Sequence, residues 1–573
     1  MMAKKVMAKN VMTKGSAAIG ILLALTTWSE IADCAPAALP PLDAGTLTSD
    51  ERNNGVELPD FGSGTATIAV PEEEKPEMSM AAEVKVQVNG FRITGQDVYQ
   101  EKVLQELLKD YQGRMVTFKE LQQGADKLTA YFRQRGYLMA RAYLPAQKIT
   151  GGIVEYTILV GRLGKVNVDN KTKIHDYIVN RELGFMKPGD YLTRKKLERA
   201  VWLLSDLAGA DAQAKLSPGE RSGTVDVLIK LAPHQGKCGA LTGDNYGNRY
   251  TNYNTYGLSY DILNPEHEGG QLALAGSATG EELYSYNINY TLPVLQNGWK
   301  ASIGYNRLSY HLGDIYRPLA AYGTSRTLSA GLDYAVVRSQ YRNLYAALHY
   351  EHTKLTDEIR LADSCLRKYS HGVVASLYGE QTLSKGVSSW RVDYKWGTLG
   401  FRDEEGWQQD KWAHTAGTFH KMRVNWQHYQ HLPHRLNLLL SARGQLASHN
   451  LDSSEHFSLG GASGVRAYPA SEASGDVGYL LRAELRYPLW QKDKNQMQLA
   501  GFIDHGGVNL ECHKQGAGEN HRYLQGAGIG ILLTRSDEGF LRADYAWPLG
   551  AERSRNDRNN ASGHFWLRGG IYF

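Results

Sequence analysis

Two short stretches of the sequence hold the side chains best suited to specific chemistry. GVRAYPASEASGD, residues 464–476, is small, polar and turn-rich. FIDHGG, residues 502–507, alternates like a strand and carries Asp504. The loop-tip residues that we single out are Val465, Arg466 and Tyr468. A guanidinium and a carboxylate can form a charge-assisted bidentate pair, so an ion pair is the chemistry that these two stretches offer.

Catalytic motifs are not supported elsewhere. HEGGQ (267–271) lacks the second histidine of a zinc-protease helix, and GASGV (461–465) lacks the flanking spacing of a nucleophile elbow. GAGIG (526–530) alternates small residues in a strand and opens no helix, which favours a close-packed wall. Beyond the N-terminal region only Cys238, Cys365 and Cys512 remain, enough for one disulfide at most. We predict no catalytic residue, no metal site and no cofactor.

The elements around the two motifs predict a membrane barrel. After residue 234 about sixteen strand-like segments can be laid out, and the composition includes 60 Gly, 34 Tyr and 11 Trp. Links after even-numbered segments are short, such as VLQNG, whereas several after odd-numbered segments are long and charged, such as FRDEEGWQQDKWAHTAG. Outer-membrane barrels have short periplasmic turns and long external loops, whereas a soluble β-sandwich has no reason for this asymmetry.

The lumen of such a barrel is where we expect the ion pair to form. The loop at about 449–474 is long enough to fold back into the lumen of a sixteen-stranded barrel. By alternation, Phe502, Asp504 and Gly506 share one face, and a carboxylate would be costly on the lipid face. We therefore predict that Arg466 pairs with Asp504 inside the lumen, and that Gly506 and Gly507 let the loop approach the wall. The alternative is an arginine exposed in an external loop.

The N-terminal part predicts export and two repeated modules. Four lysines precede the short apolar core GSAAIGILLALTTW (15–28), typical of a cleaved signal peptide, with a membrane anchor as the alternative. A tether rich in Ala, Pro and Glu follows, in which a short helix within 42–54 is weakened by Gly45. Two copies of strand, helix, helix, strand, strand come next, and Thr117 with Glu120 has the spacing of a capping box. The fold class is thus α+β repeats followed by a sixteen-stranded antiparallel transmembrane β-barrel.

Three motifs make a family resemblance specific. LPAQKITGGIVEYTILVGRLGKV (144–166), GVRAYPASEASGD and FIDHGG resemble segments of two-partner secretion outer-membrane transporters (TpsB). These form the haemolysin-activator ShlB/FhaC/HecB family, a branch of the Omp85 superfamily, whose modules are POTRA domains. One departure is Ala467, where the commonest superfamily form has glycine. The expected boundaries are 1–34 for the signal peptide, 35–83 for a flexible tether with a short plug helix, 84–161 and 162–233 for POTRA 1 and 2, and 234–573 for the barrel.

The resemblance implies a function and partners. POTRA domains in the periplasm would capture an unfolded exoprotein with an N-terminal secretion domain, and the cargo would thread through a barrel gated by the sixth loop without ATP. In the family, the arginine and aspartate matching Arg466 and Asp504 hold that loop. The chain end resembles the signal read by the barrel-assembly machinery, with an outward row that ends the last strand: Phe565, Leu567, Ile571 and Phe573. We expect a monomer in the outer membrane of a Gram-negative bacterium, in contact with lipid.

Other functions remain to be weighed. A net charge of +4 over 573 residues gives no indication of nucleic-acid binding. An Omp85-type insertase, which assembles other outer-membrane proteins, is the main alternative, and a simple porin is a third that has no need of periplasmic modules. The cargo, a haemolysin, an adhesin or a growth-inhibition toxin, is left open, because capture through backbone bonds leaves little cargo chemistry in the transporter.

Overall fold

The computed structural model describes residues 43–54, 66–69, 85–221, 223–280, 282–550, 552–555 and 563–573. The predicted signal peptide, its cleavage region and most of the predicted tether lie outside these residues. No helix in the described ranges has the length and apolar character needed to cross a membrane.

The first module packs two helices against small sheets. Its elements are β2 (Lys85–Gln87), β3 (Gly90–Thr94), α3 (Glu101–Glu106), β4 (Met115–Thr117), α4 (Phe118–Gln134), β5 (Arg141–Tyr143) and β6 (Ile153–Leu159). The capping box is confirmed, since the Glu120 amide donates to Thr117 Oγ1 and the Thr117 amide to Glu120 Oε2. Alternation over VKVQVNGFRI (84–93) predicts a single strand at the start of this module, and this prediction is wrong: β2 pairs with β4 while β3 pairs with β6, so the segment forms two separate strands.

The second module repeats the order with an added strand. It contains β7 (Arg162–Asn170), α5 (Asp176–Glu182), α6 (Arg194–Ser205), β8 (Ala210–Pro218) and β9 (Thr224–Pro233). Its sheet runs β1-β8-β9-β7, where β1 (Ala66–Ala69) comes from the predicted tether and pairs in parallel with β8. The sequence does not predict β1, because a strand of this length gains its stability from the neighbouring sheet. Ile68 packs on the apolar core of this module.

Sixteen antiparallel strands, all in the described part of the chain, close into a barrel. They are β10 (Gly239–Asp244), β11 (Thr255–Leu263), β12 (Gln271–Ala278), β13 (Leu283–Pro293), β14 (Trp299–His311), β15 (Ala321–Arg338), β16 (Arg342–Ile359), β17 (Ser364–Leu383), β18 (Gly386–Phe401), β19 (Gly417–His431), β20 (Asn437–Ala447), β23 (Val477–Lys492), β24 (Asn495–Asn509), β25 (His521–Arg535), β26 (Gly539–Pro548) and β27 (His564–Tyr572). The predicted barrel is confirmed. Its seam joins β10 to β27 over five registered pairs, from Ala240 with Tyr572 to Asp244 with Arg568.

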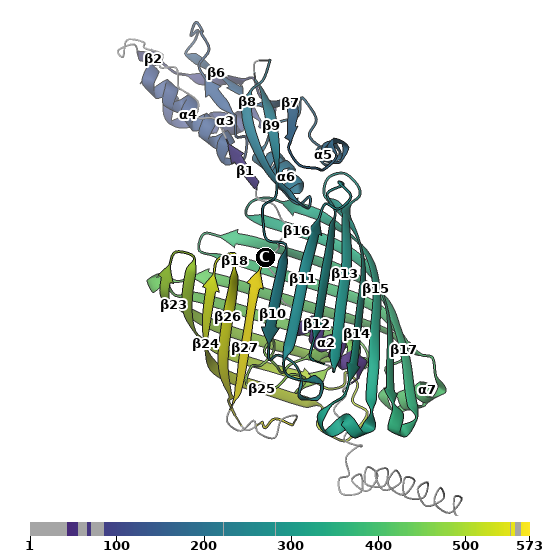
Figure 1. The fold of residues 1–573 in the computed structure, drawn as a ribbon. Coiled ribbons are helices and arrows are strands. Elements are labelled where there is room, and N and C mark those ends of the chain that lie inside the picture. The colour runs from purple at the N-terminus through teal and green to yellow at the C-terminus, as the bar shows by residue number, and fades with distance from the viewer. Residues whose placement is uncertain are drawn as a thin grey trace, which may run out of the picture.

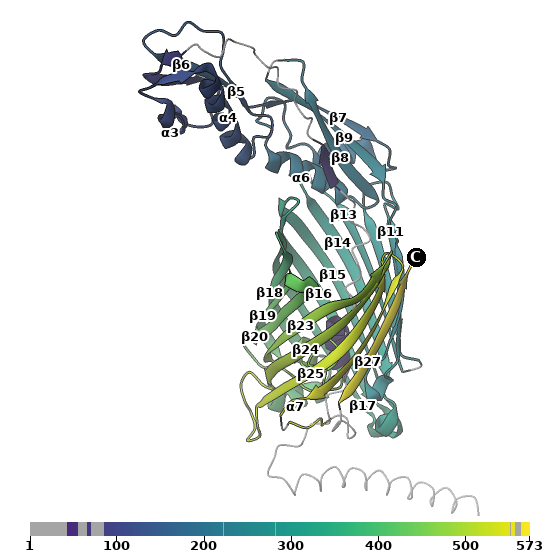
Figure 2. The ribbon, with the colours of Figure 1, turned by 90° about the vertical axis from the view of Figure 1, so that its left-hand side faces the viewer.

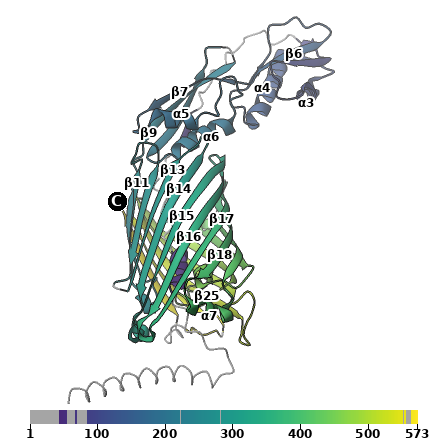
Figure 3. The same cartoon turned by 90° about the vertical axis from the view of Figure 1, so that its right-hand side faces the viewer.

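The short links and the long loops lie at opposite ends of the barrel. The modules sit over the end with the short links, and helix α7 (Glu404–Ala413) marks the end with the long loops (Figure 1). In two side views the modules arch away from the barrel axis (Figures 2 and 3). Inside the barrel lies α2 (Ala44–Asn54), drawn in purple, so a short helix does form in 42–54. Ala44 and Leu47 of α2 pack on Leu308 and Leu355 of the wall.

Candidate functional site

Loop six, residues 448–476 between β20 and β23, folds into the lumen instead of lying outside. Two short strands, β21 (Phe457–Ser458) and β22 (Ser474–Gly475), pair at its base. Val465 and Tyr468 are fully buried and pack with Leu480, Phe502 and other wall residues. Tyr468 also donates its hydroxyl to the Glu552 carbonyl at 3.1 Å. The loop tip is therefore part of the barrel core, and the alternative of an exposed external arginine is wrong.

Arg466 at this tip binds Asp504 of β24 through both arms of its guanidinium. Nε donates to Oδ2 at 2.8 Å and Nη2 to Oδ1 at 2.7 Å, and the Arg466 amide adds a third bond to Oδ2 at 3.1 Å. Both side chains are only 1% exposed. This is the bidentate pair that the alternation of 502–507 predicts.

Glu484 of β23 is a second acceptor that the sequence analysis missed. Arg466 Nη1 donates to Glu484 Oε2 at 2.6 Å, and Arg486 and Arg542 bind the same carboxylate at 2.7 and 2.8 Å. Asp504 has a second, longer contact to Arg482 Nε at 3.4 Å. The available signal was the alternation in RAELR (482–486), which puts Arg482, Glu484 and Arg486 on one face. We call Arg466, Asp504 and Glu484 the lock.

The wall around the lock accommodates the loop closely. The Arg466 guanidinium carbon lies 3.3 Å from the centroid of the Phe502 ring, a cation–π arrangement. A Cβ on Gly506 would meet Leu459 of the loop at 2.3 Å, so the close approach predicted there is confirmed. The same prediction for Gly507 is wrong: it lies on the outward face, where a Cβ would meet Tyr523 of the neighbouring strand β25 at 2.8 Å. The methyl of Ala467 faces Gly526, where a Cβ would come within 2.4 Å. An alanine at the tip thus fits because the opposite wall residue is a glycine.

Helix α2 is bound to both the wall and loop six. Lys368 Nζ of β17 donates to Asp43 at 3.0 Å, just before the helix, and Ser453 of loop six donates to the same carboxylate at 2.6 Å. Asp50 accepts hydrogen bonds from the loop-six serines Ser458, at 2.7 Å, and Ser471. The helix and the loop therefore block the lumen as one connected unit.

A cavity of about 1480 Å³ fills the lumen between this unit and the second module. It is lined at one end by Trp202 and Leu203 of α6 and by Asp206 just after this helix, and at the other end by loop six. The cavity is thus open to a chain arriving from the modules.

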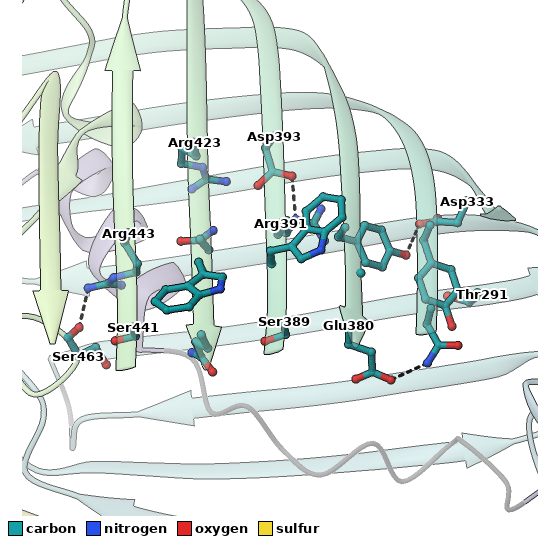
Figure 4. A pocket seen from close by; sticks show the side chains of 18 of the residues that line it. Thr291, Asp333, Glu380, Ser389, Arg391, Asp393, Arg423, Ser441, Arg443 and Ser463 are labelled. Carbon is teal, nitrogen blue, oxygen red and sulfur yellow. Dashed lines mark hydrogen bonds and ion pairs between the residues drawn. The ribbon is translucent and has the colours of Figure 1, made fainter. Parts of the chain in front are cut away.

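The cavity wall carries both acidic and basic side chains (Figure 4). Acidic side chains on β15 to β18 are held by neutral donors as well as by Arg391: Asp333 by Tyr378, Glu380 by Asn343 and Asp393 by Ser376. On the adjoining strands, Arg423 of β19 is the registered partner of Asp393, and Arg443 of β20 donates to the Ser463 carbonyl of loop six at 2.5 Å. Neither Arg423 nor Arg443 has a carboxylate at ion-pair distance within the described ranges. The charge on the lumen wall therefore changes from acidic to basic between β18 and β20.

The second module docks on the turns of the barrel. Arg338 at the end of β15 binds Asp206 through Nε at 2.8 Å and Nη2 at 2.6 Å, and Arg199 of α6 donates to the carbonyls of Asn297 and Ala335. Glu182 of α5 accepts from the Gly298 amide at 2.8 Å, while its Oε1 has no hydrogen-bond partner in the described structure. Burial raises the pKa of Glu182, although the Gly298 bond and nearby cations oppose the shift.

The other predicted site residues form a surface feature. Phe565, Leu567 and Ile571 of β27, with Phe573 after it, all point outward and are exposed as a row. Phe573 also closes the seam, where its carbonyl accepts from the amides of Cys238 and Gly239. Cys238, Cys365 and Cys512 are free thiols. No group of three metal-ligating side chains occurs among the residues that the structure describes.

Comparison with known proteins completes the description. Residues 223–533 match the family described as haemolysin secretion/activation protein ShlB/FhaC/HecB, and residues 86–161 match the ShlB-type POTRA domain. The heme/hemopexin transporter protein HuxB of Haemophilus influenzae is 27% identical over 482 residues, which cover 82% of this chain and 84% of HuxB. The outer membrane transporter CdiB of Dickeya dadantii is 24% identical over 74% of this chain and 76% of its own. The solved structure of CdiB from Escherichia coli matches with a TM-score of 0.71 and 20% identity, over 87% of this chain and 93% of that one.

Proposed function

The chain belongs to the haemolysin secretion/activation protein family ShlB/FhaC/HecB, a family of outer-membrane transporters with periplasmic POTRA domains, and from this membership we propose that it exports one large exoprotein. The cargo would carry an N-terminal secretion domain and would be a haemolysin, an adhesin or a growth-inhibition toxin. Residues 84–161 and 162–233 would serve as POTRA 1 and POTRA 2, and the chain would work as a monomer.

The cavity that joins POTRA 2 to the lumen is the observation that carries this proposal. One and the same cavity is lined by Trp202 of α6, by Asp206 just after this helix and by residues of the barrel wall. A porin needs no such connection to a periplasmic domain. An insertase must release its client sideways into lipid, and here the seam between β10 and β27 is hydrogen-bonded. The continuous path supports export through the lumen.

Capture would occur by strand addition to a POTRA sheet. Main-chain hydrogen bonds at a sheet edge bind an extended chain without demanding a particular sequence. In POTRA 2 the outer edge of β8 is already occupied by β1, so an incoming strand there has to displace residues 66–69. The edges of the POTRA 1 sheet, β3 and β5, carry no such added strand from the described tether segments. We therefore propose POTRA 1 as the first contact.

The lock and α2 would form the resting gate. Opening requires that the loop tip leave Asp504 and Glu484, and that α2 give up Lys368 and the loop-six serines. Many weak contacts with the entering chain would shift this equilibrium without ATP, and folding of the cargo outside would make the movement directional. The outward row that ends at Phe573 would be read by the barrel-assembly machinery when the protein is inserted.

Deletion of the gene tests the proposal. If a large repeat-rich exoprotein encoded beside it no longer reaches the medium or cell surface, while other barrels are present at normal levels, export is supported. Normal export together with loss of other barrels from the membrane would favour the insertase function. Export is then measured after complementation with wild-type protein and with a chain that lacks residues 85–159. This comparison distinguishes the role of the barrel from the role of POTRA 1.

A further inference from the structure

Three cationic side chains lie in one row on the outer surface of the barrel. Arg307 of β14 is the registered partner of Arg326 of β15, and Arg326 is the registered partner of Lys354 of β16. Tyr286 of β13 flanks Arg307 in the same way, and Tyr369 of β17 flanks Lys354. The row therefore reads tyrosine, three cations, tyrosine across five neighbouring strands.

All three cations point toward the membrane. Their chain neighbours Leu308, Ser325 and Leu355 are 0%, 0% and 1% exposed. Leu308 and Leu355 face the lumen, where they pack on α2. Since side chains alternate along a strand, the three cations occupy the opposite, outward face. Arg326 and Lys354 are exposed and Arg307 is half-buried.

The row lies on the extracellular side of the apolar belt. Moving along β14 toward the long loops, the outward residues are Ile303, Tyr305 and then Arg307, with His311 ending the strand. Tyr305 packs on Tyr286 with ring centroids 6.0 Å apart. Tyrosine is enriched at the level of the lipid headgroups, so the cations reach the headgroup layer of the outer leaflet.

The arrangement needs a counter-anion. Like charges in directly opposed cross-strand positions destabilise a sheet. Within the described residues, none of the three has a carboxylate at ion-pair distance, although nearby Glu358 pairs with Arg360. Neighbouring strands are about 4.8 Å apart, so the row spans about 10 Å. This length suits a headgroup that carries more than one phosphate.

We propose that Arg307, Arg326 and Lys354 bind the phosphorylated headgroup of a glycolipid in the outer leaflet. The two guanidiniums can grip phosphate oxygens with paired donors, and the lysine adds a point charge. The acyl chains would lie along the exposed Ile303, Leu328 and Tyr350 below the row. This inference rests on the outer-membrane location of the barrel and does not depend on which protein is exported.

Native mass spectrometry of the full-length protein in detergent tests the site, with phosphorylated lipid A as the probe. We expect Arg307→Gln/Arg326→Gln to weaken lipid A binding at least about tenfold, because two charge-assisted contacts are lost. The matched control is Arg342→Gln, an exposed arginine at the periplasmic end of β16, which should bind like wild type. Lys354→Gln, which retains both arginines, should give an intermediate loss of lipid A binding. This variant tests the site if the double variant does not fold.

Two competitor probes identify the ligand chemistry. Lipid A stripped of both phosphates should bind to wild type as weakly as intact lipid A binds to the double variant. Inorganic phosphate should not displace bound lipid A at equal concentration. Equal binding of intact and dephosphorylated lipid, displacement by free phosphate, or unchanged affinity in the double variant would each overturn the proposal.

Discussion

Replacing Arg466 with alanine should release the tip of loop six from the wall while the barrel stays folded. Arg466 makes three bonds to Asp504, one to Glu484 and a stacking contact with Phe502. The barrel strands on either side are joined by their own ladders, which do not involve the loop. The substitution therefore acts on the position of the loop and not on the closure of the barrel.

The free-energy cost of Arg466→Ala depends on which partners the Glu484 and Asp504 carboxylates keep. Glu484 still has Arg486 and Arg542 at 2.7 and 2.8 Å, so its charge remains compensated. Asp504 loses both guanidinium bonds and keeps the longer contact to Arg482 at 3.4 Å, together with the backbone amide of residue 466 as long as the loop stays in place. Breaking a buried pair costs about 3 to 5 kcal/mol, and the residual contact argues for the lower end, about 3 kcal/mol. The population of the released loop should rise roughly 100-fold.

Hydrogen exchange of the amides in residues 459–473 measures this population in the purified protein. We expect protection in Arg466→Ala to fall roughly 100-fold, and Arg466→Lys to restore only part of it because an ammonium cannot bind in the forked geometry. Arg486→Ala is the matched control, since Arg486 binds Glu484 and has no hydrogen bond or ion pair with loop six in the part of the chain that the structure describes. A gel shift on heating should show that all variants are folded barrels. Protection within threefold of wild type in Arg466→Ala, or an equal loss in Arg486→Ala, would refute the reasoning.

Four further outcomes are expected. In cells, Arg466→Ala and Asp504→Ala should both lower export and alter single-channel conductance while the barrel remains in the membrane; wild-type export by both would remove the lock from the mechanism. Deletion of 43–54 should raise conductance in planar bilayers, since α2 fills the lumen, and an unchanged conductance would contradict its role as a plug. Arg423→Gln/Arg443→Gln should move the reversal potential in a salt gradient toward cation selectivity, because two cations are removed from the lumen wall, whereas a shift toward anions would contradict this role. Glu182 has a raised pKa in the folded protein, so its contribution to stability is present at low pH and is lost as the pH rises through the folded pKa. Glu182→Gln should therefore flatten the rise in melting temperature of the full chain as the pH is lowered through the folded pKa of Glu182, and an identical pH profile would count against it.

Local patterns in the sequence were sufficient for the barrel and for one half of the lock. Alternation of period two assigns Asp504 to the lumen face without knowledge of any neighbour, and the parity of link lengths assigns the two rims. Glu484 lies on the same face of β23, yet alternation does not say which lumen side chain it meets. That depends on the path of a loop between two strands, which no periodic pattern records.

Helix α2 shows even more clearly how far the sequence can predict the structure. Residues 44–54 have a weak helical sequence, and the contacts that hold the helix come from more than 300 positions away: the Ala44 amide donates to Asp357, and Asp43 binds Lys368. The four-residue strand β1 likewise depends on β8. In each case a marginal local preference becomes a defined structure through a distant partner, so sequence reasoning could name a helix or a tether but not its place.

These contacts also set the order in which the lumen could be cleared. Withdrawal of α2 breaks the bonds of Asp43 with Ser453 and of Asp50 with Ser458 and Ser471, which removes support from both ends of loop six. It leaves Arg466, Asp504 and Glu484 untouched. Release of the lock alone, in contrast, would move a loop that is still bound to the helix. Loss of α2 therefore lowers the cost of moving the loop, and the deletion of 43–54 should increase exchange in 459–473 by less than Arg466→Ala but in the same direction.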